Sequence, residues 1–308
     1  MKRKINRVGQ NTLTVSLPTK WVKKIGLKQG DELELTEEGS NLIIGSSIKP
    51  QKFKINIDLS DSGTMLNRVI AAIYKAGFAQ ASVYYKTPKE LDIIQSTVYR
   101  SCHVWEIMNV KKNNVEIHSI SELNPDRFNQ ILRKLTYAVS TISKETIEAI
   151  ENNDYEQLSN IILKDRIVDR HSDYCRRIIN RGFELEYKRY GPLYVISEQM
   201  EVAADVFKII NKDIIDNKSK LSKDLMKLLK EIDILIDKLN DMIFDFDINK
   251  IRVLGMREVK IRKLIDKICA KENKNVKILA YLINLFETIF EMKSAVITLH
   301  IDDEKQVN

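Results

Sequence analysis

The N-terminal 47 residues alternate apolar and polar side chains along two stretches, 13–17 and 33–35. A period of two is typical of strands with one buried face, so both stretches predict strands, and a further strand is expected at 42–44. Between them, the helical spacing of 18–25 begins with a proline and ends before a glycine, which predicts one short helix. Such a small unit cannot bury a core alone. It has no cysteine for a stabilising disulfide, so we expect a second copy of the chain as its partner.

The region at 50–121 mixes two periods. Residues 53–57 and 81–85 alternate, as strands do, whereas 66–73 follow helical spacing up to a stop at Gly77. A hairpin is expected to close the region. The pattern predicts a small α+β unit, and because it contains no recognisable ligand motif, we favour a linker or dimerisation role over a sensor pocket.

From Pro125 onward, apolar residues recur at spacings of three and four, as they do at 128–142 and 221–239. Such stripes predict amphipathic helices packed into bundles. The scarcity of helix breakers agrees, because one proline and three glycines follow Pro125.

The helical half contains an internal repeat. Asp154 precedes Asp165 by eleven positions, and Asp247 precedes Glu258 by the same eleven, with each leading aspartate at a change from one helix to the next. Further on, MEVAAD at 200–205 aligns with a later FETIFE. The repeat predicts two tandem three-helix bundles in an all-α C-terminal half.

These patterns predict a multi-domain protein. Its expected parts are a β-rich N-terminal domain at 1–47, an α+β unit at 50–121, and helical bundles at 124–214 and 219–301.

The net charge of +7 is concentrated at one end of the chain. Eight lysines and arginines lie within the first 28 residues, before the first acid, Asp31, so the other 280 residues carry a formal charge of −1. Basicity confined to one end indicates a polyanionic partner for the N-terminus.

Other features narrow the class of protein. The three cysteines and four histidines are dispersed, which supports neither a disulfide framework nor a zinc site and fits a reducing cytoplasm. No stretch approaches the roughly 18 uninterrupted apolar residues of a membrane span, so we expect no membrane insertion. Because the sequence shows no glycine-rich phosphate loop, nucleophile elbow or zinc-protease motif, we predict that the protein is not an enzyme.

Two N-terminal segments carry a family resemblance, namely VGQNTLTVSLP at 8–18 and KWVKKIGLKQGDELEL at 20–35. They resemble the AbrB and SpoVT family, in which a glycine-led strand, a proline-started helix and a GLxxGDE turn recur in this order. The resemblance implies a swapped-hairpin β-barrel that dimerises and binds double-stranded DNA. The implied DNA-binding residues are the basic side chains of the first strand and the short helix, with two amides for base edges: Arg3, Lys4, Arg7, Gln10, Asn11, Lys20, Lys23 and Lys24.

Acid pairs four residues apart recur in the helical repeat. The first copy has Asp165 with Asp169 and, on a later helix, Glu201 with Asp205. Tandem three-helix bundles with such pairs resemble the PhoU family of phosphate-uptake regulators, whose ExxxD carboxylates bind clustered metal ions. The resemblance implies a metal site at these four residues. Converging carboxylates suit a hard cation such as magnesium, manganese, iron or calcium.

The second copy departs from this pattern. Glu258 is followed four residues later by Arg262, and the other pair is Glu287 with Glu291. Metal is less expected here, because Arg262 could form salt bridges with Glu258 or Glu287 instead. At both copies the alternative is an ordinary charged helix surface, since acid pairs at this spacing also arise by chance.

Together the resemblances imply a transcriptional regulator of phosphate uptake and homeostasis, with DNA bound at the N-terminus and a helical half that senses metal or a partner. The alternative is an interaction regulator of a phosphate transporter or kinase, in which the N-terminal module mainly dimerises.

The segment VGQNTLTVSLP also resembles MazE-type antitoxins, which share this fold but carry a short disordered tail for the toxin. An antitoxin is less expected because some 260 residues of foldable sequence follow here. We expect a cytoplasmic homodimer.

Overall fold

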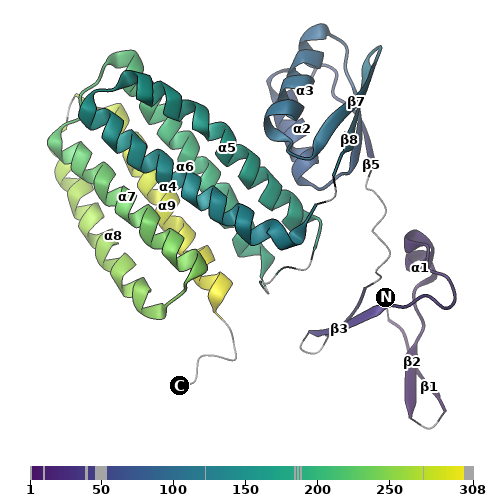
Figure 1. Ribbon diagram of the computed structural model, residues 1–308. Helices are drawn as coiled ribbons and strands as arrows, with labels where there is room; N and C mark the ends of the chain where they lie inside the picture. Colours follow the sequence, from purple (N-terminus) through teal and green to yellow (C-terminus); the bar gives the residue numbers. More distant parts are fainter. Residues whose placement is uncertain are drawn as a thin grey trace. The chain divides into compact units, whose positions relative to one another are not determined.

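The structure of the chain is a computed structural model (Figure 1). It describes residues 2–9, 11–38, 41–45, 54–121, 123–183, 185, 187, 189–272 and 274–301. The chain divides into two compact units, residues 1–53 and residues 54–308.

The N-terminal unit consists of two antiparallel hairpins with a short helix between them. One hairpin pairs β1 with β2, and the other pairs β3 with β4. Its elements are β1 Ile5–Val8, β2 Thr12–Val15, α1 Thr19–Ile25, β3 Glu34–Glu38 and β4 Asn41–Gly45. The predicted order of strand, helix, strand and strand is confirmed, and β1 is an additional strand that the apolar alternation did not reveal.

Two glycines shape the end of α1 and the turn that follows. Gly26 ends the helix in the left-handed conformation, with φ 76°. Gly30 also has a positive φ of 94°, and beside it the Lys28 backbone N–H donates to Asp31 Oδ2 at 2.6 Å. The GLKQGD segment is therefore a turn that uses glycine for its backbone and aspartate as a local acceptor.

The second unit begins with a four-stranded sheet in the order β5-β6-β8-β7. β5 is parallel to β6, whereas β8 is antiparallel to both of its neighbours. The elements are β5 Lys54–Asp58, α2 Leu66–Lys75, β6 Gln80–Tyr84, α3 Pro88–Ser101, β7 Trp105–Lys111 and β8 Asn114–Ser119. Short 3-10 turns, Gly63–Met65 and Pro125–Arg127, precede α2 and α4. The alternating segments, the helix and the closing hairpin predicted in this region are confirmed.

Long helices follow the sheet. They are α4 Phe128–Asn152, α5 Tyr155–Asn180, α6 Tyr190–Asn217, α7 Lys223–Phe244, α8 Ile248–Cys269 and α9 Val276–His300. The two aspartates that head the repeat are N-caps, because Asp154 Oδ1 accepts from the Gln157 backbone N–H and Asp247 Oδ1 from that of Asn249, each at 2.9 Å. The alignment of the two copies therefore corresponds to equivalent starts of α5 and α8.

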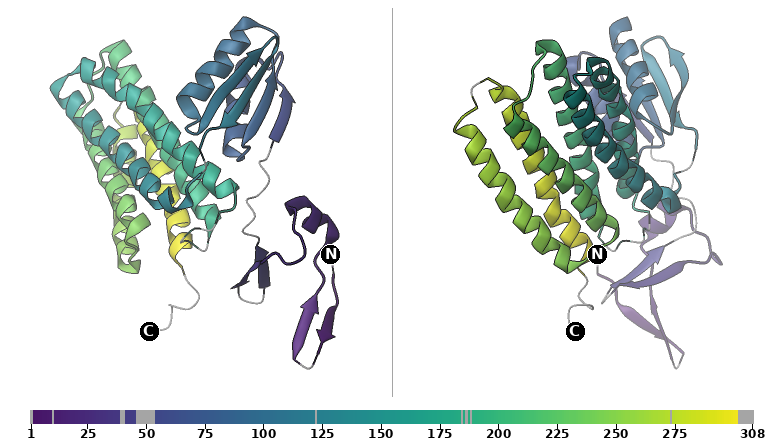
Figure 2. Two further views of the ribbon diagram at one scale, coloured as in Figure 1. Left: turned by 45° about the vertical axis from the view of Figure 1, so that its right-hand side comes forward. Right: turned by 60° about the vertical axis from the view of Figure 1, so that its left-hand side comes forward.

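The helices pack around one hydrophobic core. α5 lies against α4 and α6, α7 lies against α8 and α9, and the two groups meet where α6 packs on α9 and α4 packs on α7 (Figures 1 and 2). The predicted stripes line this core, with buried Phe128, Ile131, Leu132, Leu135, Val139, Ile142, Leu225, Leu228, Leu229, Ile232, Leu235 and Leu239. Within the described part of the chain, no helix combines the length and apolar character needed to cross a bilayer.

A buried arginine joins the sheet to the helices. Arg177 of α5 is 2% exposed, and its guanidinium donates to the Phe78 carbonyl at 2.7 Å, to Ser119 Oγ at 3.0 Å and to the Tyr74 carbonyl. Burial lowers the pKa of Arg177 to about 10, so the group remains charged at neutral pH. These charge-assisted hydrogen bonds fix the sheet and α5 as parts of one body.

Gly77 completes this junction. Its φ is 90°, and a Cβ at this position would lie 2.6 Å from Arg181 Cδ. Arg181 Nη1 also donates to the Gly77 carbonyl at 3.2 Å. The glycine that was predicted to stop α2 is thus also needed for close approach of α5.

Candidate functional site

The predicted DNA-binding residues lie before and on β1, in the hairpin loop and on α1. In the first hairpin Ile5 pairs with Val15 and Arg7 with Leu13. The described candidates are all exposed: Arg3, Lys4, Arg7, Asn11, Lys20 and Lys23. Gln10 and the side chain of Lys24 lie outside the described part of the chain.

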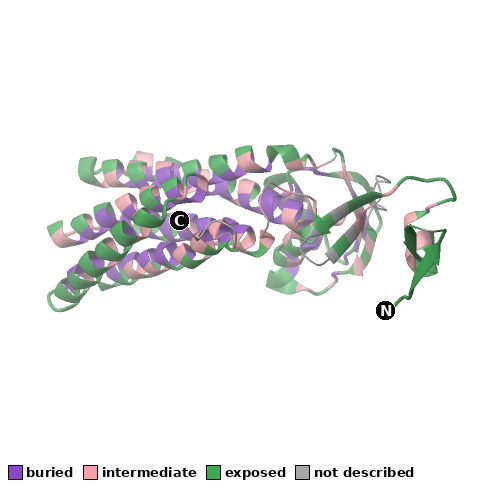
Figure 3. Cartoon of the chain, turned by 90° about the horizontal axis from the view of Figure 1, so that it is seen from below, coloured by how far each residue is buried: buried purple, intermediate pink, exposed green. Residues whose placement is uncertain are grey.

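The same strands leave their apolar side chains open to solvent. The exposed fractions are 68% for Ile5, 57% for Val8, 68% for Leu13, 45% for Val15, 62% for Leu35 and 54% for Leu42. None of the residues whose exposure is described in this unit is buried, and Figure 3 shows its strands in green. Because an isolated hairpin is only marginally stable in water, the unit needs a further surface to cover these side chains.

The first predicted carboxylate cluster lies where α5 and α6 face each other. Asp165 is 5% exposed, and Lys208 Nζ donates to Asp165 Oδ2 at 2.5 Å and to Asp205 Oδ1 at 3.0 Å. Arg176 donates to Glu201. The structure therefore brings acids of both helices together and gives each of these three a basic partner.

Asp169 lies among the same acids. Burial raises the pKa of its carboxyl to about 8, and the negative charges of Asp165, Glu201 and Asp205 raise it in the same direction. The carboxyl is therefore largely protonated at neutral pH, which reduces the repulsion within the cluster.

Sequence reasoning missed several members of this cluster. Asp173 is 4% exposed, and it pairs with Arg176 at 2.8 Å and with Lys75 of α2 at 3.6 Å. The four-residue spacing from Asp169 to Asp173 is the sequence feature that could have indicated that Asp173 belongs to this cluster. No local signal pointed to Lys75, which reaches the site only through the packing of α2 on α5.

A cleft of about 790 Å³ lies in front of this cluster. One wall is the acidic face of α5 and α6. The other is formed by α2 and α3 and includes Arg68 and Arg100. The acids of the first wall are thus paired with bases or, at Asp169, largely protonated, and the second wall adds two arginines.

The second predicted cluster is an exposed ion-pair network. Arg262 Nε donates to Glu258 Oε1 at 2.9 Å, and Arg262 Nη1 donates to Glu287 Oε1 at 2.7 Å. Glu291 pairs with Lys293 at 3.7 Å. Arg262 therefore forms both of the salt bridges that the sequence offered as the alternative to metal.

Neither cluster is arranged around a metal position in the described residues. No group of three or more His, Cys, Asp or Glu side chains in this part of the chain could hold a metal ion. A cation at the first cluster would have to displace Lys208 Nζ, and one at the second would have to displace Arg262. The residues present fit ion pairs in this arrangement, and metal binding stays a prediction.

Comparison with known proteins identifies the N-terminal unit. Residues 7–55 match the family described as antidote-toxin recognition MazE, bacterial antitoxin. The chain carries a MazE-like domain. This match supports the swapped-hairpin module predicted for the N-terminus and does not extend into the helical half. No curated protein and no solved structure matches the chain.

Proposed function

We propose that the protein is a DNA-binding regulator that acts as a homodimer through its MazE-like domain. The observation that carries this proposal is the exposed basic surface of β1 and α1, in a region where the first 28 residues of the chain hold eight bases and no acid. Each base that neutralises a phosphate releases counterions and adds affinity. A second copy would cover the exposed strands, double the basic surface and favour a two-fold symmetric DNA site.

The test is binding of the full-length protein to genomic duplex fragments, measured by fluorescence anisotropy over a range of salt concentrations. We expect affinity to fall steeply with salt, because the phosphate contacts depend on counterion release. Simultaneous replacement of Arg3→Glu, Lys4→Glu and Arg7→Glu should abolish binding.

A matched control carries the same charge change outside the MazE-like domain, at the exposed lysines Lys212→Glu, Lys238→Glu and Lys263→Glu. This control should retain most of the affinity. If the N-terminal variant binds duplex DNA as tightly as the unmodified protein, the proposal is wrong.

For the regulated process we propose phosphate uptake. The support is the helical repeat with its acid pairs, which resembles PhoU, together with the convergence of the first-copy acids on α5 and α6. Selection of bound genomic fragments with and without phosphate tests this step. Enrichment of phosphate-transport promoters is expected, and random recovery would contradict it.

Two other functions each have one supporting observation. The exposed apolar strands need a partner surface whether or not DNA is bound, which favours an interaction regulator that uses this module as a dimer clamp. Co-purification of transporter or kinase components without promoter fragments would support that role.

The description of the matched family favours an antitoxin-like regulator. Relief of growth arrest on co-expression with a candidate toxin would support this role.

A further inference from the structure

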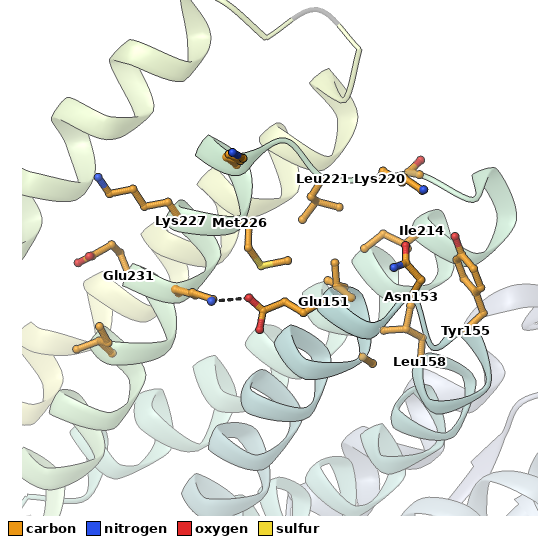
Figure 4. A pocket seen from close by; sticks show the side chains of 16 residues that line it. Glu151, Asn153, Tyr155, Leu158, Ile214, Lys220, Leu221, Met226, Lys227 and Glu231 are labelled. Atoms are coloured by element: carbon orange, nitrogen blue, oxygen red, sulfur yellow. Dashed lines mark hydrogen bonds and ion pairs between the residues drawn. The ribbon is translucent and has the colours of Figure 1, made fainter.

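A pocket opens at the end of the helical half where α4 leads into α5 and α6 leads into α7 (Figure 4). Its volume is about 690 Å³, within the usual range for small-molecule sites. The apolar floor comes from all four helices through Ile150, Leu158, Ile214 and Met226. A ligand here would contact both copies of the helical repeat at once.

One end of the pocket presents an aromatic ring beside a carboxamide. Figure 4 shows Tyr155 and Asn153 next to each other, with Leu221 and Met226 across the opening. Within the described residues, neither the Asn153 amide nor the Tyr155 hydroxyl has a side-chain hydrogen bond. A flat heterocycle can stack on such a ring, and an amide can form paired hydrogen bonds with the edge of a base.

The rest of the rim is basic. Lys220, Lys223 and Lys227 line the pocket, and none of them has an acidic partner among the described side chains. Ser222 caps α7, a helix of 22 residues, so the positive end of the helix dipole lies at the same rim. Several cations that are not neutralised locally favour a ligand with more than one negative charge.

The carboxylates of the pocket do not cancel this charge. Glu151 is paired with Lys230 at 2.5 Å, and Figure 4 draws this ion pair as a dashed line from Glu151. Glu231 is held by Arg257 at 2.9 Å and by Lys260 at 2.6 Å, both from α8. A ligand in the pocket would therefore meet a net positive charge from Lys220, Lys223 and Lys227.

We propose that this pocket binds a nucleoside phosphate, with the base at Tyr155 and Asn153 and the phosphates at Lys223 and Lys227. A fatty-acid-like anion fits the pocket less well. It carries a single negative charge, whereas the rim has several lysines, and it has no base edge that could form hydrogen bonds with the Asn153 amide. The proposal concerns residues 54–308 and does not depend on DNA binding by the MazE-like domain.

The test is calorimetric titration of the full-length protein with ATP, GTP, inorganic tripolyphosphate and decanoate in separate experiments. We expect at least one nucleotide to bind more tightly than tripolyphosphate, because only a nucleotide uses the aromatic end. Double replacement of Lys223→Gln and Lys227→Gln should weaken nucleotide binding by about tenfold or more, and Tyr155→Leu should remove the advantage over tripolyphosphate.

The matched control is Lys238→Gln, an exposed lysine of the same helix outside this pocket. It should bind the nucleotide as the unmodified protein does, and a thermal melt of each variant without ligand reports whether folding is intact. The proposal is overturned if no nucleotide binds, if tripolyphosphate binds as tightly as the nucleotides, if decanoate alone binds, or if the double variant folds and binds normally.

Discussion

Leucine side chains are exposed on the hairpins of the MazE-like domain, whereas most of those in the helical half are buried. Leu13 and Leu35 of the hairpins are 68% and 62% exposed, whereas Leu235 of α7 is fully buried. In Figure 3, buried positions follow the inner faces of the helices, while the N-terminal strands are exposed. The helical half therefore builds its core within one chain, and the MazE-like domain needs a second surface for its core.

The physical origin of this difference is the size of the elements. The N-terminal strands have four or five residues and pair in isolated hairpins, so no layer covers their faces. The helices from α4 to α9 have 22 to 28 residues and bury one stripe each against neighbours from the same chain. Local pairing forms the hairpins, but only burial of apolar surface stabilises them.

The largest effect is expected at the junction inside the second unit. Arg177→Met should lower the free energy of unfolding by about 4 kcal/mol, because the Tyr74 and Phe78 carbonyls lose their donor in a buried place. Urea unfolding of the full chain, followed by circular dichroism, measures this. Arg166→Met, an exposed arginine of the same helix, is the control and should have little effect. Equal stability of both variants would show that the sheet and the helices are not one body.

The next effect concerns the MazE-like domain. Leu13→Ala should weaken the dimer roughly 100-fold, because each of two copies loses about 1.5 kcal/mol of apolar burial. Sedimentation equilibrium over a range of protein concentrations measures the dissociation constant. Tyr137→Ala is the control, since Tyr137 is 74% exposed on the helical half. A dimer that survives Leu13→Ala but dissociates with Tyr137→Ala would reverse the comparison.

The smallest effect is expected at the second carboxylate cluster. Arg262→Met should change the free energy of unfolding by less than about 1 kcal/mol, because the side chains of Arg262 and Glu287 are 45% and 39% exposed and solvent screens their attraction. Chemical denaturation under the conditions used for Arg177→Met gives the value. A loss as large as that of the buried arginine would mean that this network is structural.

Much of the fold was predictable because its signals are local. The end of α1 follows from Gly26, and the starts of α5 and α8 follow from Asp154 and Asp247, where the side chain caps its own helix. The helical stripes follow from spacing alone. The alternation of apolar and polar residues did not predict β1, because its INRV sequence is too short to show a recognisable period.

The candidate sites were predictable only in part. The acid spacing at Asp165 and Asp169 pointed to a cluster on α5, and the structure places it against α6. The ion pairs of Lys208 with Asp165, of Arg176 with Glu201 and of Lys75 with Asp173 were not foreseen, because each joins two different helices and forms only through their packing. The pocket with Tyr155 also has no sequence motif, since its walls come from four helices.

The sequence by itself determined the position of the basic charge, the periods of the strands and helices, and the repeat in the helical half. These properties depend on residues a few positions apart, where backbone geometry links sequence to structure. Tertiary structure alone decided that Arg177 of α5 would bind the carbonyls of Tyr74 and Phe78, and that Lys208 of α6 would pair with Asp165 of α5. Such contacts join residues far apart in sequence, and they form only when the packing of the helices brings them together.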